Sequence, residues 1–586
     1  MKDRKAPREK VALDPASETW KAIPWRKLEQ HVYRIQKRIY RASQQGKQRT
    51  VQKLQKLLLK SEAARLLAVR RVTQENQGKK TAGIDGIKSV APNHRLNMVK
   101  VIHPTHWKHS KTQPVRRVWI PKPGKDEKRP LGIPVMLERA QQALVKSVLE
   151  PEWEAVFEPN SYGFRPGRSC HDAIEAIFLE IRSKPKFVLD ADIKGCFDNI
   201  EQKALLEKLK TYPQLRRVIQ TWLEAGVFDK GVFTPTEKGT PQGGVISPLL
   251  ANIALHGMEQ SMTEGCQKRA APALIRYADD LVIFHPDLEV LKQAERKIAN
   301  WLEAMGLHLN PKKTRITHTL TPHEGNVGFD FLGFTIRQHP VGKTHSGKAS
   351  NGKLLGFKTL IKPSKEAIRR HTRRTGEVLR ALKSASQEVV IIKLNQIIPG
   401  WCNYYKTVVA AKSFALCDDH LYHQLMSWGN GRHAKKGKDW VYKRYWQRED
   451  GKRWVFLTSM KTEKEVKLLK LRMHKQTHIQ RHVKVRGNAS PYDGNLLYWS
   501  KRLTDHPLMN SVRAKLLKTQ KGQCPRCGLY FQDGDLLEVD HIVPTALGGK
   551  DILSNKWVYH RHCHDEKTAE DIVHIKARTA AGINTN

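Results

Sequence analysis

The sequence predicts an α+β multidomain protein, and three observations lead to this fold class. Residues 273–284 have the pattern of an apolar strand, a tight turn with two adjacent carboxylates and a returning apolar strand. Residues 18–72 carry leucines at helical spacing between many Lys and Arg residues. Cysteines and histidines cluster near the C-terminus, and a length of 586 residues allows roughly three to five domains.

Short strands and helices alternate through the first half of the chain. Two short strands, joined by a basic hairpin shaped by Pro and Gly, occupy residues 118–134, and an amphipathic helix follows at 138–150. The basic side chains of this hairpin are suited to binding phosphate groups. A basic surface hairpin without a function accounts for the same pattern equally well. A tight glycine loop at 239–244 opens a helix near Ser247, and a Gly/aromatic strand covers 328–334.

The composition is strongly basic. The chain contains 104 Lys and Arg residues against 57 Asp and Glu residues, a formal net charge of +47. Such a charge attracts polyanions over long range and releases counterions on binding, so nucleic acid is the expected partner. An anionic membrane surface is a weaker alternative, because no long amphipathic basic helix stands out. No apolar run reaches the roughly 18 residues of a membrane span, and the first residues form neither a secretory signal nor a typical transit peptide.

Residues 341–522 hold most of this excess charge. They contain 39 Lys and Arg residues against 12 Asp and Glu residues, with Trp and Tyr interleaved. Cations for phosphate and aromatic rings for base stacking suit RNA or single-stranded nucleic acid. Most of these rings are nevertheless expected to lie in the hydrophobic core.

Carboxylates gather at the ends of predicted strands. Asp279 and Asp280 occupy the turn of the hairpin at 273–284, and Asp190 and Asp192 end an apolar strand that starts at Phe187. Two carboxylates side by side in an apolar hairpin repel each other and need a cation, whereas an isolated Asp pair is more simply explained as a solvated turn. Mg²⁺ prefers oxygen ligands, and an acidic strand end beside an acidic hairpin suits the two Mg²⁺ ions of nucleotidyl transfer.

Three of the eight cysteines lie close together near the C-terminus. Cys524 and Cys527 form one pair of possible ligands, and His560 and Cys563 form a second pair. Two pairs at such short spacings are typical of a tetrahedral zinc site. His562 competes with His560 for the remaining ligand position. The other five cysteines show no spacing pattern, which fits a cytosolic protein with one metal site rather than a disulfide scaffold.

The order of the motifs resembles that of group II intron-encoded proteins, which combine reverse transcriptase, maturase and HNH endonuclease in one polypeptide. The resemblance covers most of residues 18–586, from the basic N-terminal helices to the Cys/His cluster. Between these ends the chain contains, in order, IPKPGKDEKRPLGIP, SYGFRPGRSCHDAI, DADIKGCFDNI, GTPQGGVISPLLANI, IRYADDLVIF, GLHLNPKKT, FDFLGF and PGWCNYY. The whole ordered series is far more specific than any single motif.

This resemblance implies roles in a reverse transcriptase site. Asp192, Asp279 and Asp280 would hold two catalytic Mg²⁺ ions, with Asp190 as the alternative to Asp192. Phe197 would be the steric gate that rejects a 2′-hydroxyl, unless it is a core residue. The other substrate-binding assignments are Lys122 and Arg129 on the triphosphate, Gln242 against the incoming nucleotide, and Lys313 or Lys312 as proton donor to pyrophosphate.

The C-terminal segment resembles the HNH, or ββα-metal, nucleases. His541 would be the general base that activates water, and Asn555 would orient this base. Asp540 and His564 would hold one Mg²⁺-type ion on the scissile phosphate. A zinc knuckle that only binds DNA is the alternative interpretation, and the family more often has cysteine at the histidine position of the zinc site. The structural zinc ligands would be Cys524, Cys527, His560 and Cys563.

The resemblance also implies a right-hand polymerase fold, with α-rich fingers, a palm built on an antiparallel sheet and a helical thumb. A basic α-rich segment and a small ββα unit with structural zinc would follow. The expected boundaries are 1–345 for the reverse transcriptase with its N-terminal extension, 346–430 for the thumb or maturase X domain, 431–510 for the DNA-binding domain, and 511–586 for the HNH endonuclease domain.

The implied function is that of a multifunctional ribonucleoprotein without a membrane partner. The protein would bind group II intron RNA, promote splicing and reverse splicing, nick target DNA and extend the new 3′ end with dNTPs in target-primed reverse transcription. A stand-alone or defence-associated reverse transcriptase and a pure RNA-binding splicing factor are the alternatives. The expected location is the bacterial cytoplasm, at the nucleoid when the protein acts on DNA.

Overall fold

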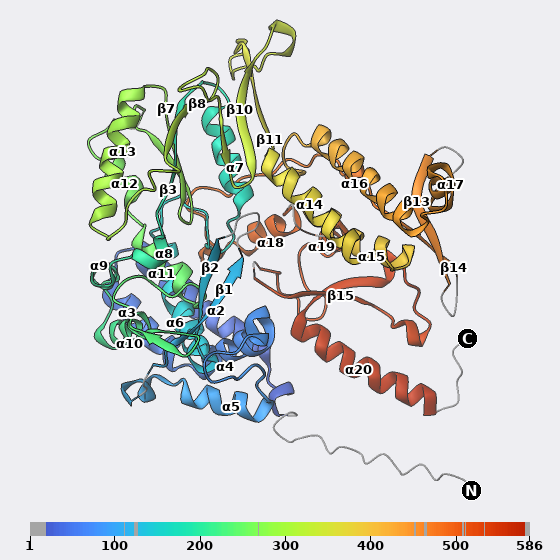
Figure 1. The fold of residues 1–586 in the computed structure, drawn as a ribbon. Helices are drawn as coiled ribbons and strands as arrows, with labels where there is room; N and C mark the ends of the chain where they lie inside the picture. Colours follow the sequence, from blue (N-terminus) through green and yellow to red (C-terminus); the bar gives the residue numbers. More distant parts are fainter. Residues whose placement is uncertain are drawn as a thin grey trace.

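The computed structural model describes residues 19–109, 112–121, 127–267, 269–449, 453–461, 466–506, 509, 511–532 and 534–580. Lys122 lies outside these residues. The described part contains five β-sheets, each flanked by helices or loops (Figure 1). The N-terminal helices lie below the central green strands in that view, and the orange and red C-terminal third lies beside them.

Three helices make up the N-terminal region that the leucine spacing predicts as helical. They are α2 (Trp25–Gln44), α3 (Gln48–Lys60) and α4 (Glu62–Arg70). Their apolar faces pack on α6 (Met136–Glu154), which contains the predicted 138–150 helix and is buried over most of its length. The connecting segments are η1 (Arg71–Glu75), η2 (Gln77–Lys80), α5 (Pro92–Val101) and η3 (Pro104–His109).

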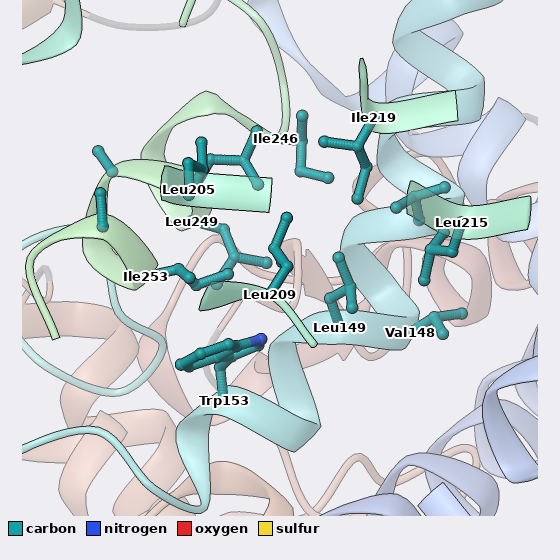
Figure 2. Packing of buried hydrophobic residues seen from close by; sticks show 14 of the residues in the cluster. Val148, Leu149, Trp153, Leu205, Leu209, Leu215, Ile219, Ile246, Leu249 and Ile253 are labelled. Atoms are coloured by element: carbon teal, nitrogen blue, oxygen red, sulfur yellow. The ribbon is translucent and has the colours of Figure 1, made fainter. Parts of the chain in front are cut away.

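The other side of α6 forms a hydrophobic core with three later helices. Figure 2 shows Leu149 and Trp153 of α6 in the same cluster as Leu209 and Leu249, all buried. Burial of each such side chain contributes about 1.5–3 kcal/mol, so this cluster fixes the N-terminal layer against the middle of the chain. The three helices are α9 (Gln202–Lys208), α10 (Pro213–Leu223) and α11 (Ser247–Ala254).

A four-stranded antiparallel sheet separates two hydrophobic cores. Successive side chains of a strand point to opposite faces of the sheet. Alternate residues of β7 therefore belong to different cores: one core also contains α13 (Leu288–Glu303), and the other contains α7 (Cys170–Ile181). The predicted hairpin at 273–284 and the predicted strand from Phe187 are confirmed. The strand order is β6-β7-β3-β8, with bounds Ala273–Tyr277, Asp280–His285, Phe187–Asp192 and Arg315–His318.

A second four-stranded sheet, β2-β1-β4-β5, contains the predicted basic hairpin. Strands β1 (Val115–Pro121) and β2 (Lys128–Ile133) pair antiparallel, and β4 (Val227–Asp229) and β5 (Val232–Thr234) extend the sheet. A three-stranded sheet is formed by β9 (Phe329–Phe331), β10 (Phe334–Pro340) and β11 (Phe357–Pro363). The remaining short elements of this half are α8 (Cys196–Asn199), α12 (Met258–Thr263) and η4 (Lys343–His345).

Long helices follow the third sheet. They are α14 (Lys365–Ala381), α15 (Gln387–Tyr405) and α16 (Ala411–Arg432), followed by the shorter α17 (Lys438–Tyr445). The expectation that most interleaved aromatic rings lie in the core is confirmed here. Tyr405, Trp428 and Tyr445 are buried, whereas Trp440 is exposed.

The prediction of an α-rich segment over residues 431–510 is wrong. Strands β12 (Trp446–Glu449), β13 (Arg453–Lys461) and β14 (Val466–Lys470) form an antiparallel sheet there. The buried run from Val455 to Leu457 combines β-branched and aromatic side chains, which favour a strand over a helix. The helical elements after this sheet are η5 (His474–Gln476), η6 (Pro491–Asp493) and α18 (Leu496–Thr504).

The C-terminal end forms a small ββα unit, as predicted. Helix α19 (Ser511–Thr519) leads into the antiparallel strands β15 (Leu537–His541) and β16 (Lys556–His560), and α20 (Arg561–Ala580) follows. Two short turns, η7 (Thr545–Leu547) and η8 (Leu553–Asn555), lie between the strands. None of the helices in the described ranges combines the length and apolar character that a bilayer crossing requires.

The segment 481–506 returns to the first half of the chain, where a buried carboxylate anchors it. Asp172 in the first turn of α7 accepts a hydrogen bond from the backbone N–H of Val485 at 2.8 Å and pairs with His482 at 3.0 Å and with Arg502. Burial alone would raise the pKa of Asp172, but the hydrogen bond with His482 and the charge of Arg502 hold it well below its usual range. The segment is therefore tied to α7 by a charge that has no exposed surface.

We expect Asp172→Ala to lower the unfolding free energy by about 3–5 kcal/mol, because it leaves Arg502 and His482 unpaired in the interior. Asp439→Ala is the matched control, since Asp439 pairs with Lys443 at an exposed surface, where such pairs contribute at most about 1 kcal/mol. Thermal melting and trypsin cleavage within 481–506 would measure the difference. Equal behaviour of the two variants would show that Asp172 anchors nothing.

Candidate functional site

The acidic residues of two neighbouring strands meet at one end of the central sheet. Asp192, the last residue of β3, lies opposite Asp280, the first residue of β7, in the antiparallel register. Asp279 precedes Asp280 in the turn after β6, so the hairpin adds a third carboxylate to the same corner. The structure thus brings Asp192, Asp279 and Asp280 together, as the sequence predicts.

The tight turn that presents these carboxylates is held by buried neighbours. Ala278 has φ 57°, a left-handed conformation that an alanine adopts only at a cost of about 1–3 kcal/mol. The fully buried Arg276 donates to the Ala278 carbonyl at 3.1 Å and to Asn252 at 3.1 Å. Gly163 packs so closely that a Cβ there would lie 2.3 Å from the Ala278 nitrogen. These contacts fix the backbone of the turn; Arg276 and Asn252 lie inside the motifs IRYADDLVIF and GTPQGGVISPLLANI, but their supporting role was not predicted.

The carboxylates are electrostatically destabilised as long as no cation lies among them. Burial, followed by the charges of Asp279 and Asp192, raises the pKa of Asp280 to about 7. The pKa of Asp279 is also raised, first by burial and then by Asp192. Lys313 offsets part of this repulsion, because its Nζ lies 2.8 Å from Asp192 Oδ2. An acidic corner of this kind fits hard divalent cations, which bind deprotonated oxygen ligands.

The two alternatives that the sequence leaves open here have different surroundings. Asp190 lies two residues before Asp192 on β3 and pairs with Arg315 at 3.0 Å, so its charge has a partner. Lys312 uses its backbone N–H to bond the Asn310 side chain at 3.2 Å, whereas the side chain of Lys313 reaches Asp192. The geometry favours Asp192 and Lys313 as the residues that face the acidic corner.

Among the described residues predicted to bind the nucleotide, Arg129 and Lys313 lie near this corner. Arg129 on β2 lies near enough to Asp279 for its charge to lower the pKa of that carboxyl. The ring of Phe197 packs edge-on against Phe164, with centroids 6.1 Å apart. The backbone of Gln242 accepts a hydrogen bond from Gly132 N at 2.5 Å, which ties the glycine loop to β2. Lys122, the remaining predicted contact, is outside the described residues.

The C-terminal unit brings its metal-binding candidates together. One ligand atom from each of Cys524, Cys527, His560 and Cys563 lies within 4.8 Å of the others, and all four residues are buried. Three sulfurs and one imidazole at this separation fit a tetrahedral zinc ion. His562 points elsewhere, because its Nδ1 lies 3.6 Å from Glu29 of α2. His560 also has a carboxylate partner, Asp535, 3.4 Å from its second ring nitrogen, as is typical of metal-binding histidines.

The predicted nuclease residues lie on β15 and the start of α20. His541 pairs through Nε2 with Asp551 at 3.0 Å, and Asp540 Oδ2 lies 3.7 Å from His564 Nε2. Lys567 also reaches Asp540, at 3.2 Å. Asp551 and Lys567 were not recognised in the sequence, although Asp551 lies in the glycine-rich loop before Asn555.

Asn555 has a different position from the one that its predicted role suggests. Its side chain accepts from Val543 N at 3.0 Å and donates to the carbonyls of Val543 and Lys550 at 3.0 and 2.9 Å. These bonds close the loop between β15 and β16. Asn555 therefore fixes the loop that carries Asp551, and Asp551 is the residue that contacts the His541 ring.

Four family models match the chain in order. They are the N-terminal domain of reverse transcriptase at residues 20–102, reverse transcriptase (RNA-dependent DNA polymerase) at 120–336, the group II intron maturase-specific domain at 368–446, and HNH endonuclease at 524–570. Protein YkfC of Escherichia coli is 30% identical over 325 residues, which cover 49% of this chain and 83% of YkfC. The chain belongs to the group II intron-encoded reverse transcriptase and maturase family.

A further relative agrees with this family. The group II intron-encoded protein LtrA of Lactococcus lactis subsp. cremoris is 31% identical over 374 residues, which cover 50% of this chain and 60% of LtrA. Among solved structures, the chain is similar to apo telomerase of Candida tropicalis, at 15% identity. The similar part covers 39% of this chain and 53% of the telomerase chain, with a TM-score of 0.31. The group II intron protein thus combines a reverse transcriptase, a maturase and an HNH endonuclease, as predicted.

A dependence on pH follows from the acidic corner of this group II intron protein. The folded pKa of Asp280, about 7, lies above the unfolded value of about 3.9, so the metal-free protein loses stability as pH rises between these values. A divalent cation offsets the repulsion only when the carboxylates are ionised. We therefore expect the increase in melting temperature on adding MgCl₂ to be small near pH 5 and to grow through about pH 7.

The control for this dependence is Asp280→Asn, which removes the charge and keeps the shape. It should raise the melting temperature of the metal-free protein at pH 8 and abolish most of the Mg²⁺-dependent increase. An increase with Mg²⁺ that does not change between pH 5 and pH 8, or that persists in Asp280→Asn, would contradict the electrostatic account of this corner.

Proposed function

We propose that Asp192, Asp279 and Asp280 form the catalytic centre at which this protein extends a DNA 3′ end on an RNA template. The observation that carries the proposal is the register of β3 and β7, which sets Asp192 opposite Asp280 beside the carboxylate of Asp279. Two Mg²⁺ ions bound there would stabilise the attacking 3′-oxygen and the leaving pyrophosphate. The matched reverse transcriptase segment at 120–336 contains all three residues.

Residues around the carboxylates would bind and orient the nucleotide. Arg129 and Lys122 belong to the basic hairpin and would contact the triphosphate, with Arg suited to bidentate phosphate binding. Phe197, whose ring is fixed by Phe164, would block a 2′-hydroxyl on the incoming sugar, and Gln242 would lie against the nucleotide. Burial opposes the charge of Lys313, but the hydrogen bond to Asp192 raises its pKa, so Lys313 keeps a proton that it can donate to pyrophosphate.

The C-terminal unit would nick DNA. His541, held by Asp551, would take the proton from the attacking water, while Asp540 and His564 would hold one Mg²⁺-type ion on the scissile phosphate. Such an ion would stabilise the charge that develops on the phosphate. A structural zinc on Cys524, Cys527, His560 and Cys563 would join the start of α20 to the loop before β15.

The modules would act together in target-primed reverse transcription. The helices α14 to α16 would serve as thumb and maturase X domain, and with the N-terminal helices would bind group II intron RNA as a ribonucleoprotein. The RNA would insert into one DNA strand, the HNH unit would nick the other, and the palm would extend the new end.

The domain boundaries expected from the sequence and a bacterial cytoplasmic, nucleoid-associated location belong to this proposal. The matched maturase and HNH segments argue against a stand-alone reverse transcriptase, and the intact acidic corner argues against a pure splicing factor.

Asp279→Ala should reduce primer extension by roughly a thousand-fold or more, because metal binding contributes several kcal/mol to the reaction. Extension of an oligo(dT) primer on poly(rA) with Mg²⁺ measures this loss. Asp192→Asn and Asp190→Asn form the matched pair, since only the former should have a comparable effect. If Asp190→Asn loses primer extension and Asp192→Asn retains it, Asp190 is the metal ligand in place of Asp192.

His541→Ala should abolish nicking of double-stranded DNA while the purified chain still contains about one zinc and extends primers normally. Zinc is measured by atomic emission after chelator washing, and nicking by a supercoiled plasmid assay. Cys563→Ser is the contrasting variant, which should lose zinc. Nicking by His541→Ala, or a wild-type chain without zinc, would contradict the corresponding assignment.

A further inference from the structure

A cavity of about 510 Å³ lies beside α7 and contains none of the residues assigned to either catalytic site. One wall is α7, another is β11 with the loop before it, and the remaining wall combines residues 407–409 with Arg481 and His482. Figure 1 shows the hairpin of β10 and β11 projecting at the top of the molecule next to α7. The cavity thus lies where α7, the three-stranded sheet of β9 to β11 and the segment 481–506 meet.

The inner walls of this cavity are apolar and aromatic. Ile174, Phe178 and Val408 line it, together with the rings of His171 and His482. Both rings are fixed, because His171 Nε2 bonds the Tyr404 carbonyl at 2.8 Å and His482 Nε2 bonds Asp172 at 3.0 Å. Burial lowers the pKa of His171 to about 4, so this ring is uncharged at neutral pH. Such walls accept a flat, uncharged group.

The opening of the cavity is cationic. Exposed residues line it, namely Arg182, Lys348, Lys358 and Arg481, and among the described lining side chains Glu175 is the single acidic one. A cavity with apolar, aromatic walls and cations at its opening is complementary to a ligand that has a planar ring and attached negative charges. The volume lies within the range of about 300–1,000 Å³ that is usual for small-ligand sites.

We propose that this cavity receives one unstacked nucleobase of a bound RNA strand, with the flanking phosphates on the four cations. The inference rests on the proposed RNA partner and adds a specific contact to it. Proteins read single-stranded or bulged RNA by stacking a splayed-out base on aromatic side chains and pairing its phosphates with Arg and Lys. Phe178, which is only partly buried, is the stacking residue, and Arg182, directly after the last residue of α7, is the first phosphate contact.

Photocrosslinking of the full-length protein tests the proposal. The probe is a set of single-stranded 16-nucleotide RNAs of mixed sequence with one 4-thiouridine, bound at 0.3 M KCl to suppress non-specific phosphate binding. Crosslinks to the segments that line the cavity, within 171–182, 347–361, 407–409 or 481–482, are expected by mass spectrometry. Crosslinks confined to other parts of the chain would overturn the assignment.

Variants of α7 make the test specific. Phe178→Ala should lose most of the cavity crosslink and weaken RNA binding roughly tenfold, as expected when one stacked base is lost. Leu179→Ala is the matched control, because Leu179 is 39% exposed on the same helix and does not line the cavity. Arg182→Glu should weaken binding without affecting the fold, and Lys184→Glu, an equal charge change outside the cavity, should weaken it less. Equal effects in both members of each pair would refute the base pocket.

Primer extension on poly(rA) with an oligo(dT) primer separates this inference from the proposed function. All four variants should extend primers within about twofold of the unmodified protein, because the cavity is outside the catalytic centre. If the unmodified protein neither binds the RNA probes nor extends primers, the proposed function fails and the base pocket fails with it. If it extends primers and binds RNA without a cavity crosslink, only the base pocket fails.

Discussion

Like-charge repulsion at the end of the central sheet is the constraint on which the rest of the polymerase half depends. Asp192 ends β3, Asp280 begins β7 opposite it, and Asp279 lies in the turn just before β7. Burial makes the repulsion among these three carboxylates larger than it would be in water. The backbone there cannot relax, because Arg276, Asn252 and Gly163 hold the turn from behind. Two hydrophobic cores, one on each face of the sheet, support that rigidity. The fold keeps the negative charges in place, and this arrangement fits the binding of divalent cations.

The same logic of buried charge joins segments that are distant in the chain. Asp172 connects α7 to residues more than three hundred positions later, and Arg168 in the preceding loop donates to the carbonyl of Gly487. A buried ion pair of this kind contributes little net stability, but it is costly to break from one side, so it specifies one arrangement. The basic second half of the chain is thereby fixed against the sheet that carries the acidic corner. RNA bound along the basic half would have a defined position relative to the primer end.

Local patterns in the sequence predict the hairpins and the two clusters of ligands, but not the groups that support them. The apolar strands around Asp279 and the ligand pairs of Cys524 and Cys563 are short-range signals, and the structure contains both. The role of Arg276 was not predicted because it depends on burial against Asn252, which belongs to a different motif. The sheet of β12, β13 and β14 was missed because the abundance of Lys and Arg in that region hides a short strand-forming run. Asp551 was missed because its contact with His541 exists only after the loop has closed through Asn555.

The C-terminal unit has a small hydrophobic core. Among its described residues the buried cluster holds nine, and three of them are the cysteines Cys524, Cys527 and Cys563. Apolar burial of this extent does little against the conformational entropy of the segment, so the zinc ion proposed above would supply part of the folding free energy. His562 lies between two of the ligands in sequence and contacts Glu29 on α2, which Arg70 also approaches. Helix α20, which carries His562 and Cys563, thus contacts the N-terminal helices, and a metal ion at the proposed zinc site would also hold the start of this helix where it docks.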